Sequence, residues 1–116
     1  MIAEIADTDA LRFWSDVCLD MVHGQEPELN IRQMAILLTI YLEAPPHSVA
    51  GLADKLGVTK PVITRALDAM GRMGLVMRRR DKKDRRLLRI QRTVEGAIYL
   101  EKLSDSVRKH LGENVE

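Results

Sequence analysis

The chain has 116 residues, of which 46% are hydrophobic and 30% are charged, and its 18 basic and 17 acidic side chains nearly balance. This length fits one domain with its own core, and the apolar content argues against a disordered chain. No apolar run approaches the roughly 18 residues of a membrane-spanning helix, and the acidic amino terminus differs from the basic start of a secretory signal. We therefore expect a single cytoplasmic domain, residues 1–116, that makes no membrane contact.

Cysteine, histidine and aromatic residues are too few or too scattered for several functions. Cys18 is the single cysteine, which excludes an intramolecular disulfide, and its apolar neighbours predict a buried, inert thiol. His23, His47 and His110 lie far apart in the sequence, so we expect them at the surface or at helix caps rather than on a metal. With 3% aromatic residues, the chain is unsuited to stack single-stranded nucleic acid. We expect no metal and no cofactor.

Charge is distributed unevenly along the chain. Residues 1–30 contain one basic and seven acidic side chains, whereas residues 78–92 contain nine basic and only two acidic ones. The near-neutral total therefore conceals one strongly basic segment, which is a candidate contact for a polyanion.

The first predicted helix covers residues 9–23, where apolar side chains recur at helical spacing. Asp7 or Thr8 is suited to cap it. Its apolar stripe is broad and includes Phe13 and Trp14, so we expect this helix to cover a core or a partner surface.

A second helix is predicted to begin after Asn30, which has the spacing of a capping box with Gln33, and to end before Pro45. Because this segment is apolar nearly all round, we expect a central, buried helix.

Residues 49–73 have the internal spacing of a helix-turn-helix. Ser48 is suited to cap a short helix, Gly57 supplies a left-handed turn, and a second helix follows from Thr59 or Lys60. Small and apolar side chains are expected to fill the space between the two helices, namely Leu52, Ala53, Leu56, Val58, Ile63 and Ala66.

The second helix of this motif presents a face rich in hydrogen-bond donors. If its apolar side chains point inward, its polar ones point outward, where they fit the major groove of DNA. Arg65 is suited to a bidentate contact with guanine. The candidate base contacts are Thr59, Lys60, Pro61, Thr64 and Arg65. The alternative is a helix face that only contacts solvent.

Residues 75–92 are predicted to form a β-hairpin, with strands at 75–77 and 87–92 and a turn at 81–84. The apolar side chains expected to anchor its base are Leu75, Met77, Leu88 and Ile90. The basic residues here and just before the hairpin are candidate phosphate contacts, namely Arg72, Arg78, Arg79, Arg80, Lys82, Lys83 and Arg89. The alternative is a charge run that only aids solubility, but the adjacent helix-turn-helix favours DNA.

A last helix is predicted over residues 94–111, with Thr93 as its cap. Apolar residues recur along one side of it, namely Ala97, Ile98, Leu100, Leu103, Val107 and Leu111.

These motifs together resemble the winged helix-turn-helix of MarR-type regulators over residues 29–100. The resemblance rests on the second helix of the motif and on the Gly-Leu-Val sequence that enters the hairpin. It also rests on Asp84 and Arg86 in an Asp-x-Arg pattern, and on Thr93 and Gly96 in a Thr-x-x-Gly pattern. It implies a mainly α fold with a β-hairpin wing, flanked by amino- and carboxy-terminal helices.

The resemblance also assigns roles in the wing. It implies that Arg86 inserts into the minor groove of DNA while Asp84 holds it, with Arg85 beside them. Where the family commonly has leucine before the threonine, this chain has Arg92, which we expect to extend the basic strand toward phosphate.

A homodimer formed by the terminal helices is a further implication of the resemblance. The chain ends about one helix earlier than is common in the family, so we expect the interface to come from residues 9–23 and 94–111. The candidate interface residues are Leu11, Trp14, Cys18, Leu103, Val107 and Leu111. Family members often bind small anionic ligands near this interface, so a small-molecule effector is a further candidate partner.

The expected function is a sequence-specific, double-stranded-DNA-binding transcriptional regulator of bacterial or archaeal type, usually a repressor. It would bind a pseudo-palindrome as a homodimer, in the cytoplasm and associated with the nucleoid. The alternative is a winged-helix module for protein interaction, without sequence-specific DNA binding. We do not expect an enzyme, since no nucleophile–base pair, phosphate loop or metal cluster is present in the sequence.

Overall fold

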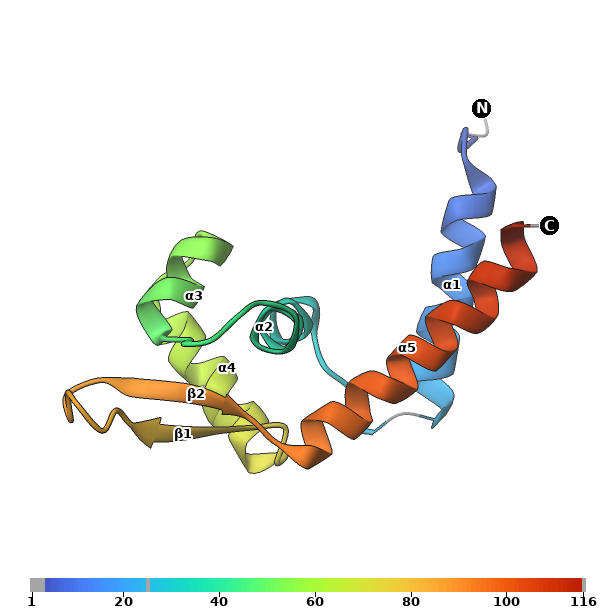
Figure 1. The fold of residues 1–116 in the computed structure, drawn as a ribbon. Coiled ribbons are helices and arrows are strands. Elements are labelled where there is room, and N and C mark those ends of the chain that lie inside the picture. Colours follow the sequence, from blue (N-terminus) through green and yellow to red (C-terminus); the bar gives the residue numbers. More distant parts are fainter. Residues whose placement is uncertain (1–3, 25, 116) are drawn as a thin grey trace. The chain divides into compact units, whose positions relative to one another are not determined.

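The computed structural model describes residues 4–24 and 26–115. Helices α1 (Thr8–Gly24), α2 (Ile31–Leu42), α3 (Val49–Leu56) and α4 (Lys60–Arg72) are followed by strands β1 (Val76–Arg80) and β2 (Leu88–Arg92) and by helix α5 (Val94–Val115) (Figure 1). The predicted fold class, mainly α with one β-hairpin, is confirmed. Within the described residues, no helix combines the length and the apolar character needed to cross a membrane.

The chain folds as two compact units. The larger unit, Leu29–Leu100, holds α2, α3, α4, the hairpin and the first turns of α5. The smaller unit combines α1 with the remainder of α5. Helix α5 therefore contributes to both units.

Three helices begin where their sequences predict. Asn30 and Gln33 form a reciprocal capping box, with hydrogen bonds of 2.7 and 3.0 Å between each backbone N–H and the other side chain. The Ser48 hydroxyl accepts from Gly51 N at 3.1 Å and caps α3. Before α1, the Asp7 carboxylate accepts the backbone N–H of Ala10 at 3.1 Å.

The larger unit is built around the middle of α2. Ile36, Leu37 and Ile40 are fully buried there, as the sequence predicts for the centre of this helix. Burial along the whole helix is not observed, because Ile31 and Leu42 lie at its two ends and are 77% and 78% exposed. The same core receives the inner face of α4 and side chains of the hairpin and α5, namely Ile63, Ala66, Leu67, Met70, Leu75, Val76, Ile90 and Tyr99.

The hairpin is antiparallel, and Arg80 near its tip lies opposite Leu88. Because side chains alternate between the two faces of a strand, Val76 faces the core and its neighbour Met77 faces away. Leu88 lies near the tip and is 37% exposed. Of the four predicted anchors, Leu75 and Ile90 are confirmed by their burial in the core, whereas Met77 and Leu88 are wrong. Val76 takes the place of Met77.

In the smaller unit, a hydrogen-bonded cluster around Asp20 joins α1 to α5. The carboxylate accepts from the Ser106 hydroxyl at 2.7 Å and lies 2.8 Å from Nε2 of His110. The bond from Ser106, and then that from His110, lowers the pKa of Asp20. His110 is buried here, so the prediction of a surface or capping position is wrong for it. His47 is also buried, but its Nε2 lies 3.2 Å from the carbonyl oxygen of Glu43, the C-cap residue of α2, which agrees with the predicted capping position.

A partly buried polar junction joins α2, the hairpin and α5 in the larger unit. The Tyr41 hydroxyl lies 2.8 Å from the Leu75 carbonyl oxygen and 3.1 Å from that of Thr93, and it accepts from Thr93 N at 2.8 Å. The Thr93 hydroxyl donates to the Gly74 carbonyl oxygen at 2.7 Å and accepts from Gly96 N at 2.9 Å. Thr93 is thus confirmed as the cap of α5, and the same side chain also holds the entry to β1.

Gly96 has no room for a side chain, because a Cβ built there overlaps the Tyr41 hydroxyl and the Leu75 carbonyl oxygen. Gly112, in the same helix, has open space. We expect Gly96→Ala to destabilise the protein by about 1–3 kcal/mol, because the junction must shift. Gly112→Ala should instead stabilise it by about 0.5–1 kcal/mol. Urea denaturation followed by circular dichroism measures both, and equal stabilities of the two variants would contradict the packing at Gly96.

Candidate nucleic-acid interface

The turn between α3 and α4 has the geometry that its sequence predicts. Gly57 ends α3 in the left-handed conformation, at a φ of 68°. Val58 N then donates to the Ala53 carbonyl oxygen at 3.1 Å. Ala53 and Leu52 are buried in the core that α3 shares with α4, so the two helices of the motif are held at one fixed angle.

Helix α4 keeps its apolar side chains in the core and presents a polar face to solvent. Pro61 lies in the first turn, where its missing N–H costs no helical hydrogen bond. Four of the five predicted base contacts are exposed and one, Thr64, is half-buried; the exposed ones are Thr59, Lys60, Pro61 and Arg65. The structure thus brings the predicted base-contacting residues together on one accessible part of the helix.

Asp68 lies farther along α4 and forms an ion pair with the wing. Its Oδ1 lies 2.7 Å from Nη2 of Arg78 on β1, and the two side chains are 42% and 30% exposed. The pair links α4 to β1, the first strand of the hairpin. One donor of Arg78, a predicted phosphate contact, is therefore engaged within the protein.

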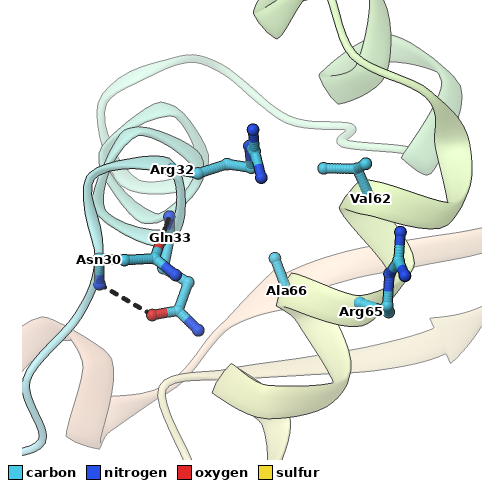
Figure 2. A pocket seen from close by; sticks show the side chains of 6 residues that line it. All are labelled: Asn30, Arg32, Gln33, Val62, Arg65 and Ala66. Carbon is cyan, nitrogen blue, oxygen red and sulfur yellow. Dashed lines mark hydrogen bonds between the residues drawn. The ribbon is translucent and has the colours of Figure 1, made fainter.

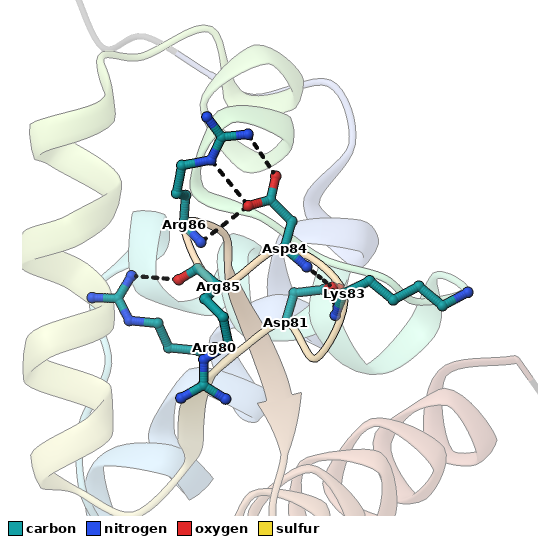
Figure 3. Close-up of polar contacts among 6 residues, drawn as sticks. All are labelled: Arg80, Asp81, Lys83, Asp84, Arg85 and Arg86. Carbon is teal, nitrogen blue, oxygen red and sulfur yellow. Dashed lines mark hydrogen bonds and ion pairs between the residues drawn. The ribbon is translucent and has the colours of Figure 1, made fainter.

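The turn of the wing is organised by Asp81 (Figure 3). Its Oδ1 accepts the backbone N–H groups of Lys83 at 2.8 Å and of Asp84 at 2.9 Å. Its Oδ2 lies 3.1 Å from Nε of Arg89. These bonds, above all the one from Asp84 N, lower the pKa of Asp81. The carboxylate stays ionised, and it orders the loop that carries the basic tip.

Asp84 and Arg86 form the ion pair that their Asp-x-Arg spacing implies (Figure 3). Both the backbone N and Nε of Arg86 donate to Oδ1 of Asp84 at 3.1 Å, and Nη2 lies 3.3 Å from Oδ2. The side-chain bond from Arg86 is the main cause that lowers the pKa of Asp84. Because the Arg86 side chain is 91% exposed, its guanidinium is both oriented and accessible.

The remaining cations of the wing are available to a ligand. Within the described part of the chain, five exposed side chains form no ion pair, namely Arg79, Arg80, Lys82, Lys83 and Arg85. The guanidinium of Arg80 does donate to the Arg85 carbonyl oxygen at 3.1 Å. Arg72, at the end of α4, is also exposed. Clustered, unpaired cations are the groups that release counterions from a polyanion when it binds.

Arg92 does not extend this basic surface as the sequence suggests. Its Nε donates to the Ile40 carbonyl oxygen and its Nη2 to that of Glu43, both at 2.9 Å. The guanidinium also lies over the Tyr41 ring, 5.8 Å from the ring centre. Arg92 therefore caps the carboxyl end of α2, where free carbonyl groups need donors.

An open hollow of about 200 Å³ lies between the first turn of α2 and the helix α4 (Figure 2). It is lined by Asn30, Arg32, Gln33, Val62, Arg65 and Ala66. The sequence alone does not single out Arg32, because no local pattern shows that the start of α2 lies beside α4. This arginine adds a cation next to the predicted base-contacting face.

The predicted dimer residues lie in the smaller unit and differ in exposure. Three are well exposed, with Leu11 at 50%, Trp14 at 44% and Leu111 at 45%. Cys18 is half-buried, so the prediction of a buried thiol is wrong within a single chain; Val107 is half-buried as well, and Leu103 is buried within the protein itself. Exposed apolar side chains are therefore present on both terminal helices.

A helix-turn-helix with an accessible polar face, followed by a basic hairpin on the same core, defines a winged helix-turn-helix. The MarR family model matches residues 29–88 of this sequence. The chain belongs to the MarR family, which is a class of transcription regulators and not of enzymes.

One relative is similar to this chain in sequence, and another is similar in structure. The HTH-type transcriptional repressor YetL of Bacillus subtilis is 39% identical over 67 residues, a match that covers 56% of this chain and only 40% of YetL. The transcriptional regulator Tm0710 of Thermotoga maritima has a similar structure, with 22% identity and a TM-score of 0.76 over 90% of this chain and 70% of that one.

The transcriptional repressor CouR is a third similar protein. Bound to a 23-mer DNA duplex, it has 24% identity and a TM-score of 0.71 over 93% of this chain and 73% of that one. CouR of Rhodococcus jostii RHA1 bound to p-coumaroyl-CoA has 25% identity and a TM-score of 0.65 over 90% and 71%. These solved structures show that the fold is shared.

We expect Asp81→Ala to loosen the turn of the wing, because the N–H groups of Lys83 and Asp84 lose their acceptor. Their protection factors in hydrogen exchange, measured by NMR, should fall. Hydrogen bonds in the folded state lower the pKa of Asp81. The stabilisation of the folded protein by this carboxylate is therefore complete above the ordinary carboxyl pKa, and it is lost as the pH falls through the lowered pKa of the folded state.

The exposed Asp54 on α3 provides a matched control, and Asp54→Ala should leave both amides unchanged. Equal protection of Lys83 and Asp84 in the wild type and in Asp81→Ala would show that the carboxylate does not order the turn.

Proposed function

We propose that this chain is a sequence-specific, double-stranded-DNA-binding transcriptional regulator that acts as a repressor. The observation that carries the proposal is the exposed polar face of α4 beside a wing in which five cations form no ion pair within the described residues. The similarity to YetL, a transcriptional repressor, and to CouR, solved with a DNA duplex, supports it.

In this proposal, α4 enters the major groove and reads base edges. Lys60, Thr64 and Arg65 carry the readout, because guanidinium, ammonium and hydroxyl groups match the donor and acceptor pattern of base pairs there. Thr59, the N-cap residue of α4, and Pro61, in its first turn, approach the bases as well and add polar and apolar contact. Arg65 contributes most, since its bidentate geometry suits guanine.

The wing grips the neighbouring backbone and minor groove. Arg86 enters the minor groove, where a narrow, A·T-rich sequence concentrates negative potential. Asp84 holds its guanidinium, so less side-chain freedom is lost on binding, and Arg85 lies beside the pair. The phosphate contacts are Arg72, Arg79, Arg80, Lys82 and Lys83, with Arg78 and Arg89 contributing beside their aspartate partners.

We further propose that the protein acts as a homodimer on a pseudo-palindrome. The exposed apolar side chains of α1 and α5 would be covered by a second copy, since exposed Trp and Leu favour burial. Each recognition helix would read one half-site, with centres about 10 base pairs, or about 34 Å, apart.

A small-molecule effector is a further element of the proposal, supported by the structure of CouR with p-coumaroyl-CoA. A ligand that binds the DNA-free form better than the DNA-bound form would release the operator. Because the proposed partner is chromosomal DNA, the protein would act in the cytoplasm, at the nucleoid.

Arg65→Ala is expected to weaken operator binding by about 1–3 kcal/mol and to relax specificity at particular bases. Lys82→Ala should instead weaken binding to all DNA sequences alike and reduce the slope of log K against log salt by about one. The operator is obtained by selecting bound fragments from genomic DNA, and fluorescence anisotropy then measures each variant. Arg12→Ala, which removes an exposed arginine of α1, is the control.

Wild-type operator affinity in Arg65→Ala would contradict the base readout. The alternative is a winged helix used for protein interaction, which the exposure of Leu19 and Val22 on α1 also favours. The same assay distinguishes it from a DNA-binding regulator. A basic wing that serves DNA binding must bind random duplex at low salt. No binding under those conditions would favour the protein-interaction module.

Trp14→Glu should weaken the homodimer by about 2 kcal/mol or more, because it places a charge in an apolar interface. Sedimentation velocity over a range of concentrations measures the change. Leu42→Glu, at a 78% exposed position of α2 in the larger unit, is the matched control and should leave the dimer intact. A Trp14→Glu protein that dimerises like the wild type would place the interface elsewhere.

A further inference from the structure

We propose that Arg32, in the first turn of α2, binds a backbone phosphate of duplex DNA at the hollow between α2 and α4. This inference rests on the proposed function. It extends the DNA-binding surface to a helix outside both the helix-turn-helix and the wing, and it assigns a contact to a residue that no sequence pattern marks.

The lining of the hollow is cationic and contains no carboxylate. Arg32 and Arg65 are both exposed, and within the described residues neither forms an ion pair. In Figure 2, the Arg32 side chain extends from α2 toward Val62 of α4, and Arg65 lies on α4 as well. The wing differs, because three of its arginines are each paired with an aspartate. Two unpaired guanidinium groups on the walls of one hollow favour an anion between them.

The capping box of α2 leaves further donors at the hollow. Oδ1 of Asn30 accepts from Gln33 N at 2.7 Å, and Oε1 of Gln33 accepts from Asn30 N at 3.0 Å (Figure 2). Both side-chain oxygens are thus engaged within the helix, and the two NH₂ groups remain as donors. A lining of guanidinium and amide donors matches the acceptor oxygens of a phosphate.

The position of the hollow favours a phosphodiester of the half-site. Arg65, which we propose to read a base, is part of its lining, so a DNA strand followed by α4 passes close to Arg32. Ile36 and Leu37 of α2 share one buried core with Ile63 of α4. The walls are therefore held in place before DNA arrives, which keeps the ordering cost of binding low.

The salt dependence of binding tests this contact. Arg32→Ala should weaken binding to the operator and to a mixed-sequence duplex alike, by roughly three- to tenfold, and reduce the slope of log K against log salt by about one. Arg32→Lys should retain the slope, because it keeps the charge. Arg12→Ala, on α1, removes an exposed arginine in the smaller unit and should change neither quantity. Circular dichroism verifies that every variant is folded.

The result separates this inference from the proposed function. If the wild type binds no duplex at low salt, the proposed function and this contact are both overturned. If Arg65→Ala and Lys82→Ala have their expected effects while Arg32→Ala has the slope of the wild type, only the contact at Arg32 is overturned.

Two further probes identify the source of the phosphate. Single neutral methylphosphonates are placed along the operator; at one position the wild type should lose affinity while Arg32→Ala loses nothing further. Inorganic phosphate is titrated separately and followed by NMR at the Arg32 amide, where no saturation is expected. Saturable, Arg32-dependent phosphate binding without coupling to any methylphosphonate would assign the hollow to a free phosphorylated ligand and overturn the DNA assignment.

Discussion

The polar junction around the Tyr41 hydroxyl is the constraint on which the larger unit depends. It joins the carboxyl half of α2 to the entry of β1 and the start of α5, and the missing side chain at Gly96 allows this close approach. Arg92 adds two bonds to the last carbonyl groups of α2. Partly buried polar networks favour one arrangement only when their members are bonded, and no buried side-chain polar atom of the described residues lacks a partner. Because α2 also supplies the centre of the core, the junction fixes the wing relative to α4.

Three aspartates orient arginine side chains of the wing, and the wing nevertheless remains strongly basic. Asp68, Asp81 and Asp84 each pair with an arginine of the hairpin. The pair of Asp84 with the exposed Arg86 contributes little to the free energy of folding, so its main effect is on side-chain direction. Hydrogen bonds to their carboxylates lower the pKa values of Asp81 and Asp84, which favours the ionised form of both. The wing keeps a positive field over its whole length, while three of its guanidinium groups have defined positions.

Local features could be predicted from the sequence because their partners lie within a few residues along the chain. The caps of α1, α2, α3 and α5 and the left-handed Gly57 are of this kind. The errors arise where partners are distant or where two residues are equivalent in pattern. Arg92 bonds to α2, far back in the sequence, and the strand pattern cannot show this. Val76 and Met77 are both apolar, so only packing against the core decides which one faces inward. Arg32 reaches its place beside α4 through tertiary folding alone.

The proposed recognition of DNA combines long, unpaired cationic side chains with a helix that is fixed on the core. Long, unpaired cations supply affinity through counterion release, and they are tolerant of position. Base readout does not tolerate such shifts in position, since a bidentate contact requires the helix to lie at a fixed depth and angle in the groove. Phosphate contacts on the wing and at α2 set that depth only if all three elements are held on one core. A shift at Tyr41 or Gly96 would move the wing relative to α4, so it would misplace the base contacts without altering any residue that touches DNA. Specificity in this protein therefore depends on the packing behind the interface as much as on the side chains in front of it.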